Sequence, residues 1–305
     1  MKHTGALAFL LITGLVMTDC NRQPSAPETT VPHRHVIGML LSMTEETPFF
    51  ISLVKGAGEA ADRLNVTLSI RYARDDPDLQ SADLLSMIDD RVNALLVNPV
   101  SDAVVPAIEK AAAAGIPVFT IDRSAPSDTI ICHIASDNLS GGRMAGEYLA
   151  EKLNRRGNVV ELEGTPGSSA AHYRGAGFNQ IMATYPDITV IARKAANFTR
   201  SDGKAVFAHI LADYPKIDGV FAHNDDMILG AIKAAKEAGR SKDIMFVGFD
   251  AIEEAIDALE SGDLLATVAQ RPAEMGRIGV ETAFKHLQAE AVPKSIPVDL
   301  ALITK

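Results

Sequence analysis

The sequence predicts an α/β protein with two lobes, each a doubly wound and largely parallel sheet of the Rossmann type. Strand and helix patterns alternate from about residue 35 to the end of the chain, which is typical of parallel sheets covered by helices. Most strands are near-continuous apolar runs, as expected when both faces of a sheet are buried. The strands are too many for one compact lobe, and a chain of 305 residues has room for two.

In the first half of the chain, helix boundaries are marked by residues with clear terminal preferences. Thr47 and Pro48 are typical of the N-cap and the first residue of a helix, and Gly115 is typical of the position after a helix end. The expected strands cover 35–42, 66–73, 94–99, 117–122 and 130–136, and the expected helices cover 47–64, 77–91 and an Ala-rich stretch that ends at Gly115.

The second half repeats the alternation. The expected helices cover 137–154, 168–185, 199–214, 226–239, 251–261 and 272–290. The expected strands cover 158–164, 189–195, 219–225, 244–250, 265–270 and a last strand at 296–303. The weak repetition of the pattern favours two similar lobes, although no strong sequence repeat supports them.

The N-terminus predicts export. Lys2 precedes an apolar run over 6–17 that is too short to span a bilayer comfortably and has the pattern of a secretory signal within residues 1–20. Cys20 resembles a lipoprotein acceptor, but Asp19 replaces the small residue preferred there, so lipidation and ordinary cleavage both stay open. Residues 21–33 are a polar linker. We expect a periplasmic or extracytoplasmic protein, with a lipid anchor through Cys20 as the open alternative.

Charge and cysteine content exclude some classes of protein. The formal net charge is −10, which makes nucleic acid an unexpected partner. Cys20 and Cys132 are the two cysteines, so no disulfide remains if Cys20 is lipidated or removed. Cys132 lies in an apolar strand and is expected to be a small buried side chain.

Polar side chains stand at the carboxyl ends of several predicted strands. In open parallel sheets, this edge is where ligands bind. Helix capping is the alternative for single positions, and Asp225 and Ser101 are candidates for that role. The residues at the strand ends are Asn98, Asp122, Arg123, Asn224, Asp225, Asp250 and Gln270.

These residue types suit the recognition of a polyol. A carboxylate accepts hydrogen bonds from two neighbouring hydroxyls, an amide both donates and accepts, and a guanidinium donates in a fixed fork. The apolar faces of a sugar need flat aromatic partners, and Phe49, Phe50, Phe198 and Phe249 lie near strand ends or helix starts. Phe49 and Phe50 are adjacent, so we expect that both cannot face the core.

Motifs of other chemistries are missing. The sequence has no P-loop, no Gly-x-Gly-x-x-Gly after the first strand and no Gly-x-Ser-x-Gly elbow, and its eight histidines show no metal-binding spacing. No nucleophile has an evident base. We therefore expect no cofactor, no metal, no catalytic residue and no enzymatic activity. His133, His172 and His223 are candidates for pocket rims or structural hydrogen bonds.

Several stretches of the chain match the motifs of a known family: PFF (48–50), LLVNP, TIDR, HIASDN (133–138) with GGRMAGEYLA, SAAHYRGAGF (169–178), VFAHNDDMILGA, VGFD, ATVAQRP and PVDL. Through them, the chain from about residue 35 to 305 resembles the periplasmic ribose-binding protein family, the type I sugar-binding proteins of ABC importers. The resemblance implies two lobes joined by a three-segment hinge. It places the first lobe at 34–132 plus 271–299 and the second at 133–270 plus 300–305.

The resemblance also implies a set of sugar-binding residues. Arg174 is added by the resemblance alone, because it belongs to a predicted helix. Thr47 departs from the asparagine that ribose-binding proteins carry at this position, and the acidic loop 43–47 is one residue longer, which puts ribose itself in doubt. The implied ligand contacts are Phe49, Phe50, Asn98, Asp122, Arg123, Arg174, Phe198, Asn224, Phe249, Asp250 and Gln270, with Thr47 beside them.

By this resemblance, the function is that of a monomeric substrate-binding protein of an ABC importer. It would bind a ribose-like pentose, a related hexose or a cyclic polyol between its lobes by hinge closure, and then deliver it to the membrane permease. The alternative is a periplasmic sensor that presents sugar to a chemoreceptor or a sensor kinase. A repressor effector domain is disfavoured, because the chain lacks a DNA-binding helix-turn-helix and carries an export signal.

Overall fold

The structure is a computed structural model that describes Met1 and residues 34–305. Residues 34–305 form one compact unit. The predicted signal peptide, the linker and Cys20 lie outside the described residues. Within 34–305, no helix combines the length and the apolar character needed to cross a bilayer.

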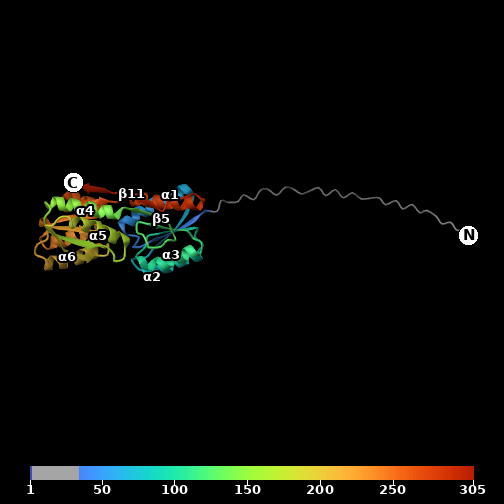
Figure 1. Cartoon of the computed structure of the whole chain (residues 1–305), viewed down its shortest axis with the longest axis horizontal. Coiled ribbons are helices and arrows are strands. Elements are labelled where there is room, and N and C mark those ends of the chain that lie inside the picture. The colour runs from blue at the N-terminus through green and yellow to red at the C-terminus, as the bar shows by residue number, and fades with distance from the viewer. Residues whose placement is uncertain (2–33) are drawn as a thin grey trace. The chain divides into compact units, whose positions relative to one another are not determined.

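The first sheet has six parallel strands in the order β11-β5-β4-β3-β1-β2. Figure 1 labels two of them, the paired strands β5 and β11. Alternate strand residues enter different apolar clusters, so both faces of the sheet are covered: Leu95 packs with α2 and α3, whereas Leu96 packs with α1 and α9. The strands are β1 (Val36–Leu41), β2 (Thr67–Tyr72), β3 (Ala94–Val97), β4 (Val118–Ile121), β5 (Ile130–Ser136) and β11 (Ser295–Val298).

The second sheet has six strands in the order β12-β10-β9-β8-β6-β7, of which β12 is antiparallel to its neighbour. Helices again cover both faces: Val159 packs with α4 and α5, whereas Val160 packs with α6 and α7. The strands are β6 (Gly157–Glu163), β7 (Ile188–Ala195), β8 (Gly219–Ala222), β9 (Met245–Asp250), β10 (Ala266–Ala269) and β12 (Ala301–Thr304).

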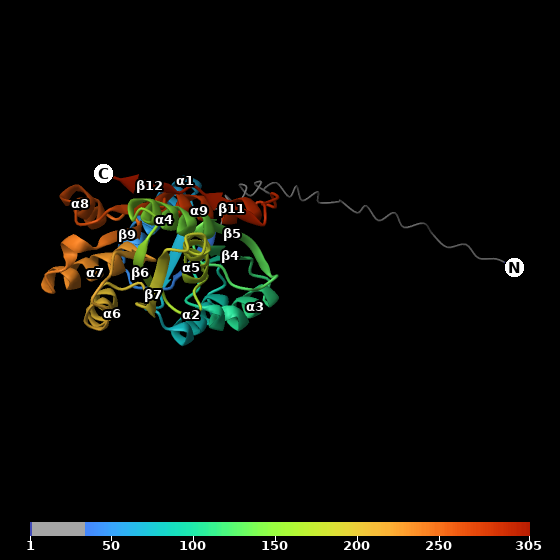
Figure 2. The ribbon, with the colours of Figure 1, turned by 60° about the vertical axis from the view of Figure 1, so that its left-hand side comes forward.

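The helices begin and end within a few residues of the predicted positions. Figure 2 shows α2 and α3 beside the first sheet and α6 and α7 beside the second. The helices are α1 (Pro48–Leu64), α2 (Pro77–Asp89), α3 (Val105–Ala113), α4 (Asn138–Lys152), α5 (Ser169–Met182), α6 (Arg200–Asp213), α7 (Asp225–Glu237), α8 (Glu253–Ser261) and α9 (Pro272–Leu287), with short 3-10 turns η1 (Asp102–Val104) and η2 (Ser241–Asp243). The predicted fold class, two largely parallel sheets with flanking helices, is confirmed.

The prediction of one last strand at 296–303 is wrong. This segment forms two strands that are separated at Asp299 and Leu300 and belong to different sheets. Val298 pairs beside Ser136 in the first sheet, and Ala301 pairs beside Ala269 in the second. Apolar residues stand on both sides of the charged Asp299, so the pattern alone does not reveal that the chain changes sheets there.

The chain crosses between the sheets three times: after β5, after β10, and between β11 and β12. All of β5 pairs within the first sheet, so a division by sheets falls after Ser136. The lobe boundaries given above stay a prediction. Parallel connections of this kind restrict two lobes to a hinge motion.

Close packing of α4 on α5 explains the glycine-rich stretch 141–146. A Cβ atom at Gly142 would lie 2.1 Å from the carbonyl oxygen of Arg174, which is shorter than any van der Waals contact. The missing side chain therefore lets the two helices approach each other.

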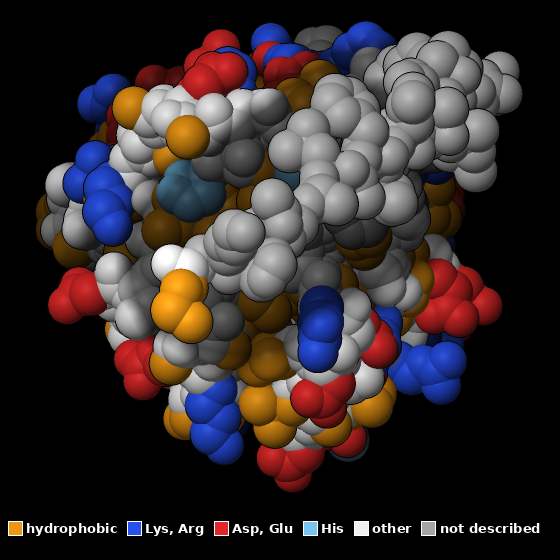
Figure 3. All heavy atoms as spheres, turned by 90° about the vertical axis from the view of Figure 1, so that its right-hand side faces the viewer, with side chains coloured by type: hydrophobic (Ala, Val, Ile, Leu, Met, Phe, Trp, Pro, Cys, Tyr) orange, Lys and Arg blue, Asp and Glu red, His pale blue; other side chains and the backbone are white. Residues whose placement is uncertain are grey.

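On the face of the molecule in Figure 3, acidic and basic side chains are interspersed and neither kind gathers in one large patch.

Candidate functional site

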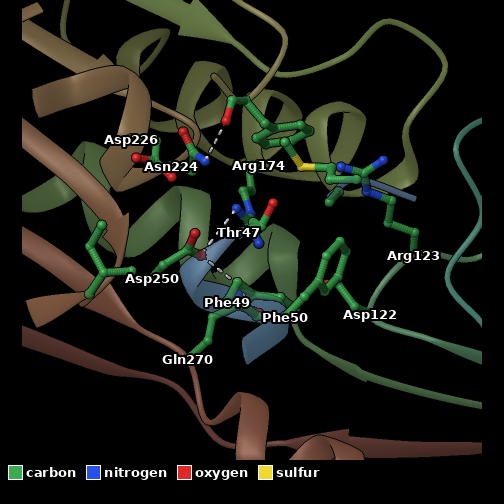
Figure 4. A pocket seen from close by; sticks show the side chains of 14 residues that line it. Thr47, Phe49, Phe50, Asp122, Arg123, Arg174, Asn224, Asp226, Asp250 and Gln270 are labelled. Carbon is green, nitrogen blue, oxygen red and sulfur yellow. Dashed lines mark hydrogen bonds and ion pairs between the residues drawn. The ribbon is translucent and has the colours of Figure 1, made fainter. Parts of the chain in front are cut away.

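A cavity lies where residues from the carboxyl ends of both sheets meet, and it holds about 430 Å³ of empty space (Figure 4). Ten of the predicted site residues line it, and Asn98 and Phe249 do not. The lining set is Met43, Thr47, Phe49, Phe50, Asp122, Arg123, Ala170, Arg174, Phe198, Asn224, Asp226, Asp250, Ile252 and Gln270.

The backbone turns at Asp122, and this turn brings two charged neighbours to the same cavity. Adjacent side chains on an extended strand point to opposite faces. Asp122 has φ 61°, in the left-handed region, directly after β4 ends at Ile121. Asp and Asn tolerate this region better than most residues. Both Asp122 and Arg123 are therefore buried at the cavity wall.

The Asp122 carboxylate has one oxygen fixed and one oxygen free. Its Oδ2 accepts a hydrogen bond of 2.9 Å from Asn98 Nδ2, while Oδ1 is buried without a partner among the described residues. Asn98 is fully buried behind the wall, where its Nδ2 also donates to the Ile121 carbonyl at 3.0 Å. Asn98 therefore orients Asp122, and its predicted contact with ligand stays a prediction.

Arg123 reaches across the cleft to an aromatic ring of the second lobe. Its guanidinium carbon lies 5.0 Å from the centre of the Phe198 ring, a distance suited to a cation–π interaction. Burial lowers the pKa of Arg123, and the charge of Asp122 opposes that shift. Phe198 itself has φ 59°, in the left-handed region, and Arg123 directly follows Asp122, which has φ 61°. Left-handed backbone therefore occurs on both sides of this contact. Such strain is concentrated at functional sites.

Arg174 projects from α5 and is held in a fixed orientation. Its Nε donates to Asn138 Oδ1 at 2.8 Å and its Nη1 donates to the carbonyl of His223. The guanidinium carbon lies 3.7 Å from the centre of the Phe249 ring. Phe249 is therefore buried beneath Arg174 and supports it, and its predicted contact with ligand stays a prediction.

Asp250 and Gln270 form the wall opposite the first lobe. Gln270 Nε2 donates to Asp250 Oδ1 at 2.8 Å, and Arg174 Nη1 lies 3.6 Å from the same oxygen. Gln270 Oε1 is buried without a partner in the described part of the chain. Burial raises the pKa of Asp250 to about 7, and the Arg174 charge opposes the rise.

The raised pKa of Asp250 predicts a pH dependence of stability without ligand. In the unfolded chain, the Asp250 carboxyl has the ordinary pKa of about 4, whereas in the native state its pKa is about 7. Between pH 4 and 7, the native state therefore binds more protons than the unfolded state. The stabilisation from Asp250 is thus present below pH 4 and is lost as pH rises, by at most about 1.4 kcal/mol per pH unit. Urea unfolding at several pH values should show this fall, and Asp250→Asn should remove its part of it. Identical profiles would contradict the assignment.

Asn224 caps a helix as well as lining the cavity. Its Oδ1 accepts from the Met227 backbone N–H at 3.0 Å, and its Nδ2 donates to the Phe198 carbonyl at 3.1 Å. The interpretation of Asp225 as a cap is wrong, because Asn224 takes that position. Asp225 is fully buried and accepts from Thr267 Oγ1 at 2.8 Å. Ser101 is a cap, as expected, at the start of η1.

The two phenylalanines at the start of α1 are both buried and belong to one apolar cluster. This corrects the expectation that both cannot face the core. Phe49 and Phe50 pack edge to face with ring centres 5.6 Å apart, and both line the cavity. A helix N-terminus that enters a cleft between lobes has protein on more than one side. Thr47 is the N-cap, but its hydroxyl makes no cap bond and lies 3.4 Å from the Thr44 hydroxyl.

Four lining residues were not predicted: Met43, Ala170, Asp226 and Ile252. They lie one or more residues beyond a strand end, in a loop or in the first turn of a helix. Asp226 and Ile252 lie two residues after the predicted site residues Asn224 and Asp250, which is the signal that could have found them.

Histidines and cysteine have structural surroundings. His223 Nδ1 accepts from the Gly164 N–H at 3.2 Å, and its Nε2 lies 2.9 Å from Glu161 Oε1. Cys132 is a free, fully buried thiol, as expected. In residues 34–305, no three His, Cys, Asp or Glu side chains gather as a metal-binding group.

Comparison with known proteins decides the family. A family model described as a periplasmic binding protein domain matches residues 37–291. The chain belongs to this family. The family implies an extracytoplasmic location.

Relatives of this periplasmic binding protein include a curated import protein and several solved structures. It is 42% identical to the ribose import binding protein of Escherichia coli K12, over 87% of this chain and 90% of that one. It resembles an ABC transporter solute-binding protein of Actinobacillus succinogenes with bound D-allose, with 31% identity, a TM-score of 0.82, and 89% and 98% of the two chains covered. It also resembles a fructose-binding periplasmic domain of a hybrid two-component system, with 31% identity, a TM-score of 0.86, and 89% and 91% covered.

Proposed function

We propose that this periplasmic binding protein is the sugar-binding component of an ABC importer and that it closes around one monosaccharide or cyclic polyol. The observation that carries the proposal is a pair of buried acceptors on the cavity wall, Asp122 Oδ1 and Gln270 Oε1, which have no partner among the described residues. A buried acceptor without a donor is costly, so each is suited to a ligand hydroxyl.

The rest of the wall fits a neutral polyhydroxylated ligand. Arg123 and Arg174 supply donors in fixed orientations, and the carboxylates of Asp122 and Asp250 offset their charge. Phe49, Phe50 and Phe198 offer apolar surface to the C–H faces of a ring. We assign the ligand-binding role to the cavity-lining residues on these grounds.

Closure links ligand binding to the hinge. In this structure, the lobes meet through the Ser124 backbone N–H, which donates to Ser169 Oγ at 2.7 Å, and through Arg123 over Phe198. A ligand that bonds to groups of both lobes favours the closed state, because only there are all its bonds made. A permease would then recognise the closed form.

Import is favoured over sensing. A solved relative is part of a two-component system, but the curated relative at 42% identity is an import protein. Relatives that bind and transport substrates also favour a protein without enzymatic activity. We further propose that the protein is monomeric and that the loop 43–47 takes part in the choice of sugar. Glu45 of this loop lies 3.9 Å from Arg74. Lipid anchoring through Cys20 is proposed from the sequence.

A thermal-shift panel tests the proposal. The mature protein is heated with pentoses including D-ribose, hexoses including D-allose and D-fructose, inositols, and amino acids. One sugar or inositol is expected to raise Tm by several degrees, because a ligand at about 100 times its Kd stabilises the native state by roughly 2.7 kcal/mol. A response to amino acids alone, or to no sugar, would contradict the proposed function.

A further inference from the structure

A second cavity lies beside the sugar cavity on the hinge side, and we call it the hinge cavity. Its lining includes Asp122, Ser124 and the β5 residues His133 and Ser136. Ser169 and Tyr173 of α5 line it from the other lobe. Every residue that lines it, except Leu139, carries a polar side-chain group.

The two cavities share a wall. Asp122 lines both cavities. Of the two residues that follow it, Arg123 lines the sugar cavity and Ser124 lines the hinge cavity. The same division occurs on α5, where Arg174 lines the sugar cavity and Tyr173 the hinge cavity. Asp122 therefore separates the two cavities, and a group attached to a sugar beside Asp122 would enter the hinge cavity by passing this side chain.

Several polar groups around the hinge cavity have unused hydrogen-bonding capacity. The Ser136 hydroxyl is buried without a partner in the described chain, and so is Asp122 Oδ1. Ser136 is 5% exposed and Asp122 is 6% exposed, so neither group is simply solvated. His133 uses Nδ1 to bond the Thr120 hydroxyl at 2.9 Å, which leaves Nε2 for another partner.

An exposed aromatic ring stands at the edge of the same cavity. Tyr173 is 46% exposed, and it is the one exposed side chain among the phenylalanines and tyrosines of residues 34–305. Its ring packs edge to face with His172 at 5.1 Å, which holds it in place. A rigid amphipathic ring with one free face is typical of recognition surfaces.

We propose that the hinge cavity is a second carbohydrate subsite, which takes a hydroxylated substituent linked to the sugar in the first cavity. The ligand class is then a glycoside with a small polar aglycone or a two-unit sugar. Tyr173 would cover the apolar face of the substituent, and Ser136 and His133 would bond its hydroxyls. This inference rests on the proposed function, because it extends the ligand of the same site.

Calorimetry with matched pairs of ligands tests the subsite. The free sugars of the thermal-shift panel are compared with their α- and β-linked glyceryl glycosides, on the mature wild-type protein. At least one glyceryl glycoside is expected to bind within about threefold of its free sugar or more tightly. Tyr173→Ala and Ser136→Ala should each weaken that glycoside by about tenfold, equivalent to about 1.4 kcal/mol, and change the free sugar by less than about twofold.

The variants are chosen so that misfolding does not decide the result. Ser136→Ala removes an unpaired buried hydroxyl and is expected to fold normally. Tyr185→Ala, at a tyrosine of the same lobe that bonds Glu147 away from both cavities, is the matched control and should change neither ligand.

The outcomes separate this inference from the proposed function. If free sugars bind but every glycoside binds more than about a hundredfold more weakly, the subsite is refuted and the proposed function stands. Equal weakening of free sugar and glycoside by Tyr173→Ala, or no effect on the glycoside, also overturns the subsite. If neither free sugars nor glycosides bind, the proposed function itself fails.

Discussion

Replacing Asp122 by alanine is expected to abolish measurable sugar binding and to leave the stability of the unliganded protein nearly unchanged. The variant removes the free Oδ1 acceptor on the cavity wall, and loss of a charged partner to buried hydroxyls costs roughly 2–5 kcal/mol, or about 30- to 5,000-fold in affinity. The native state loses the Asn98 bond and a charge that offsets Arg123, but it also loses an unpartnered buried acceptor, and Asn98 Nδ2 still donates to the Ile121 carbonyl. We expect these changes largely to cancel. Calorimetry with the best sugar of the panel measures the first effect, and urea unfolding measures the second.

Two further variants at acidic positions sharpen this test. Asp122→Asn keeps the shape and tolerates the left-handed backbone, so an affinity loss in Asn as well as Ala assigns the effect to the carboxylate. Asp128→Ala, at an exposed acidic residue of the same lobe, is the matched control and should bind normally. An Asp122→Ala protein that unfolds without ligand would show that Asp122 is structural.

Replacing Arg174 by methionine is expected to remove sugar binding and also to destabilise the protein. The guanidinium bonds Asn138 and the His223 carbonyl and lies 3.6 Å from Asp250. Removing one partner of a buried ion pair costs about 3–5 kcal/mol, and the value here should be near the lower end, since Asp250 has a pKa of about 7 and can take up a proton. Urea unfolding and calorimetry measure the two effects.

The double variant Arg174→Met with Asp250→Asn distinguishes binding from stability. Neutralising both partners should restore part of the lost stability, because no unpaired buried charge remains. It should not restore binding, because both ligand-facing charges are gone. Recovery of sugar binding in the double variant would contradict a direct role for Arg174.

The fold was largely predictable because each element has its own local signal. Apolar runs mark the buried strands, and residues such as Pro48 and Gly115 mark helix boundaries. The last strand was not predictable in this way. Its break at Asp299 and Leu300 depends on which sheet offers a free edge, and that edge is made by residues far away in the sequence, such as Ser136 and Ala269.

The candidate site was predictable where it lies at strand ends. Asp122, Arg123, Asp250 and Gln270 follow buried strands and all line the cavity. Arg174 comes from a helix, and the residues alone gave no reason to choose it, whereas its motif resembles that of a known family.

The division of labour within the site was beyond the sequence. Asn98 and Asp122 both end buried strands, yet the first is fully buried behind the second and hydrogen-bonds to it. Phe249 and Phe198 are both phenylalanines at element ends, yet one supports Arg174 and the other lines the cavity. These differences arise from depth in the folded structure, which depends on contacts between segments distant in the chain.

A crystal structure of the mature protein with the best sugar of the panel tests the central claim most directly. We expect one sugar in the cavity between the lobes, with hydroxyls that donate to Asp122 Oδ1 and Gln270 Oε1, and with Arg123 and Arg174 donating to its oxygens. A sugar bound elsewhere on the molecule, or in the cleft with Asp122 Oδ1 and Gln270 Oε1 both without a sugar hydroxyl, would contradict the account.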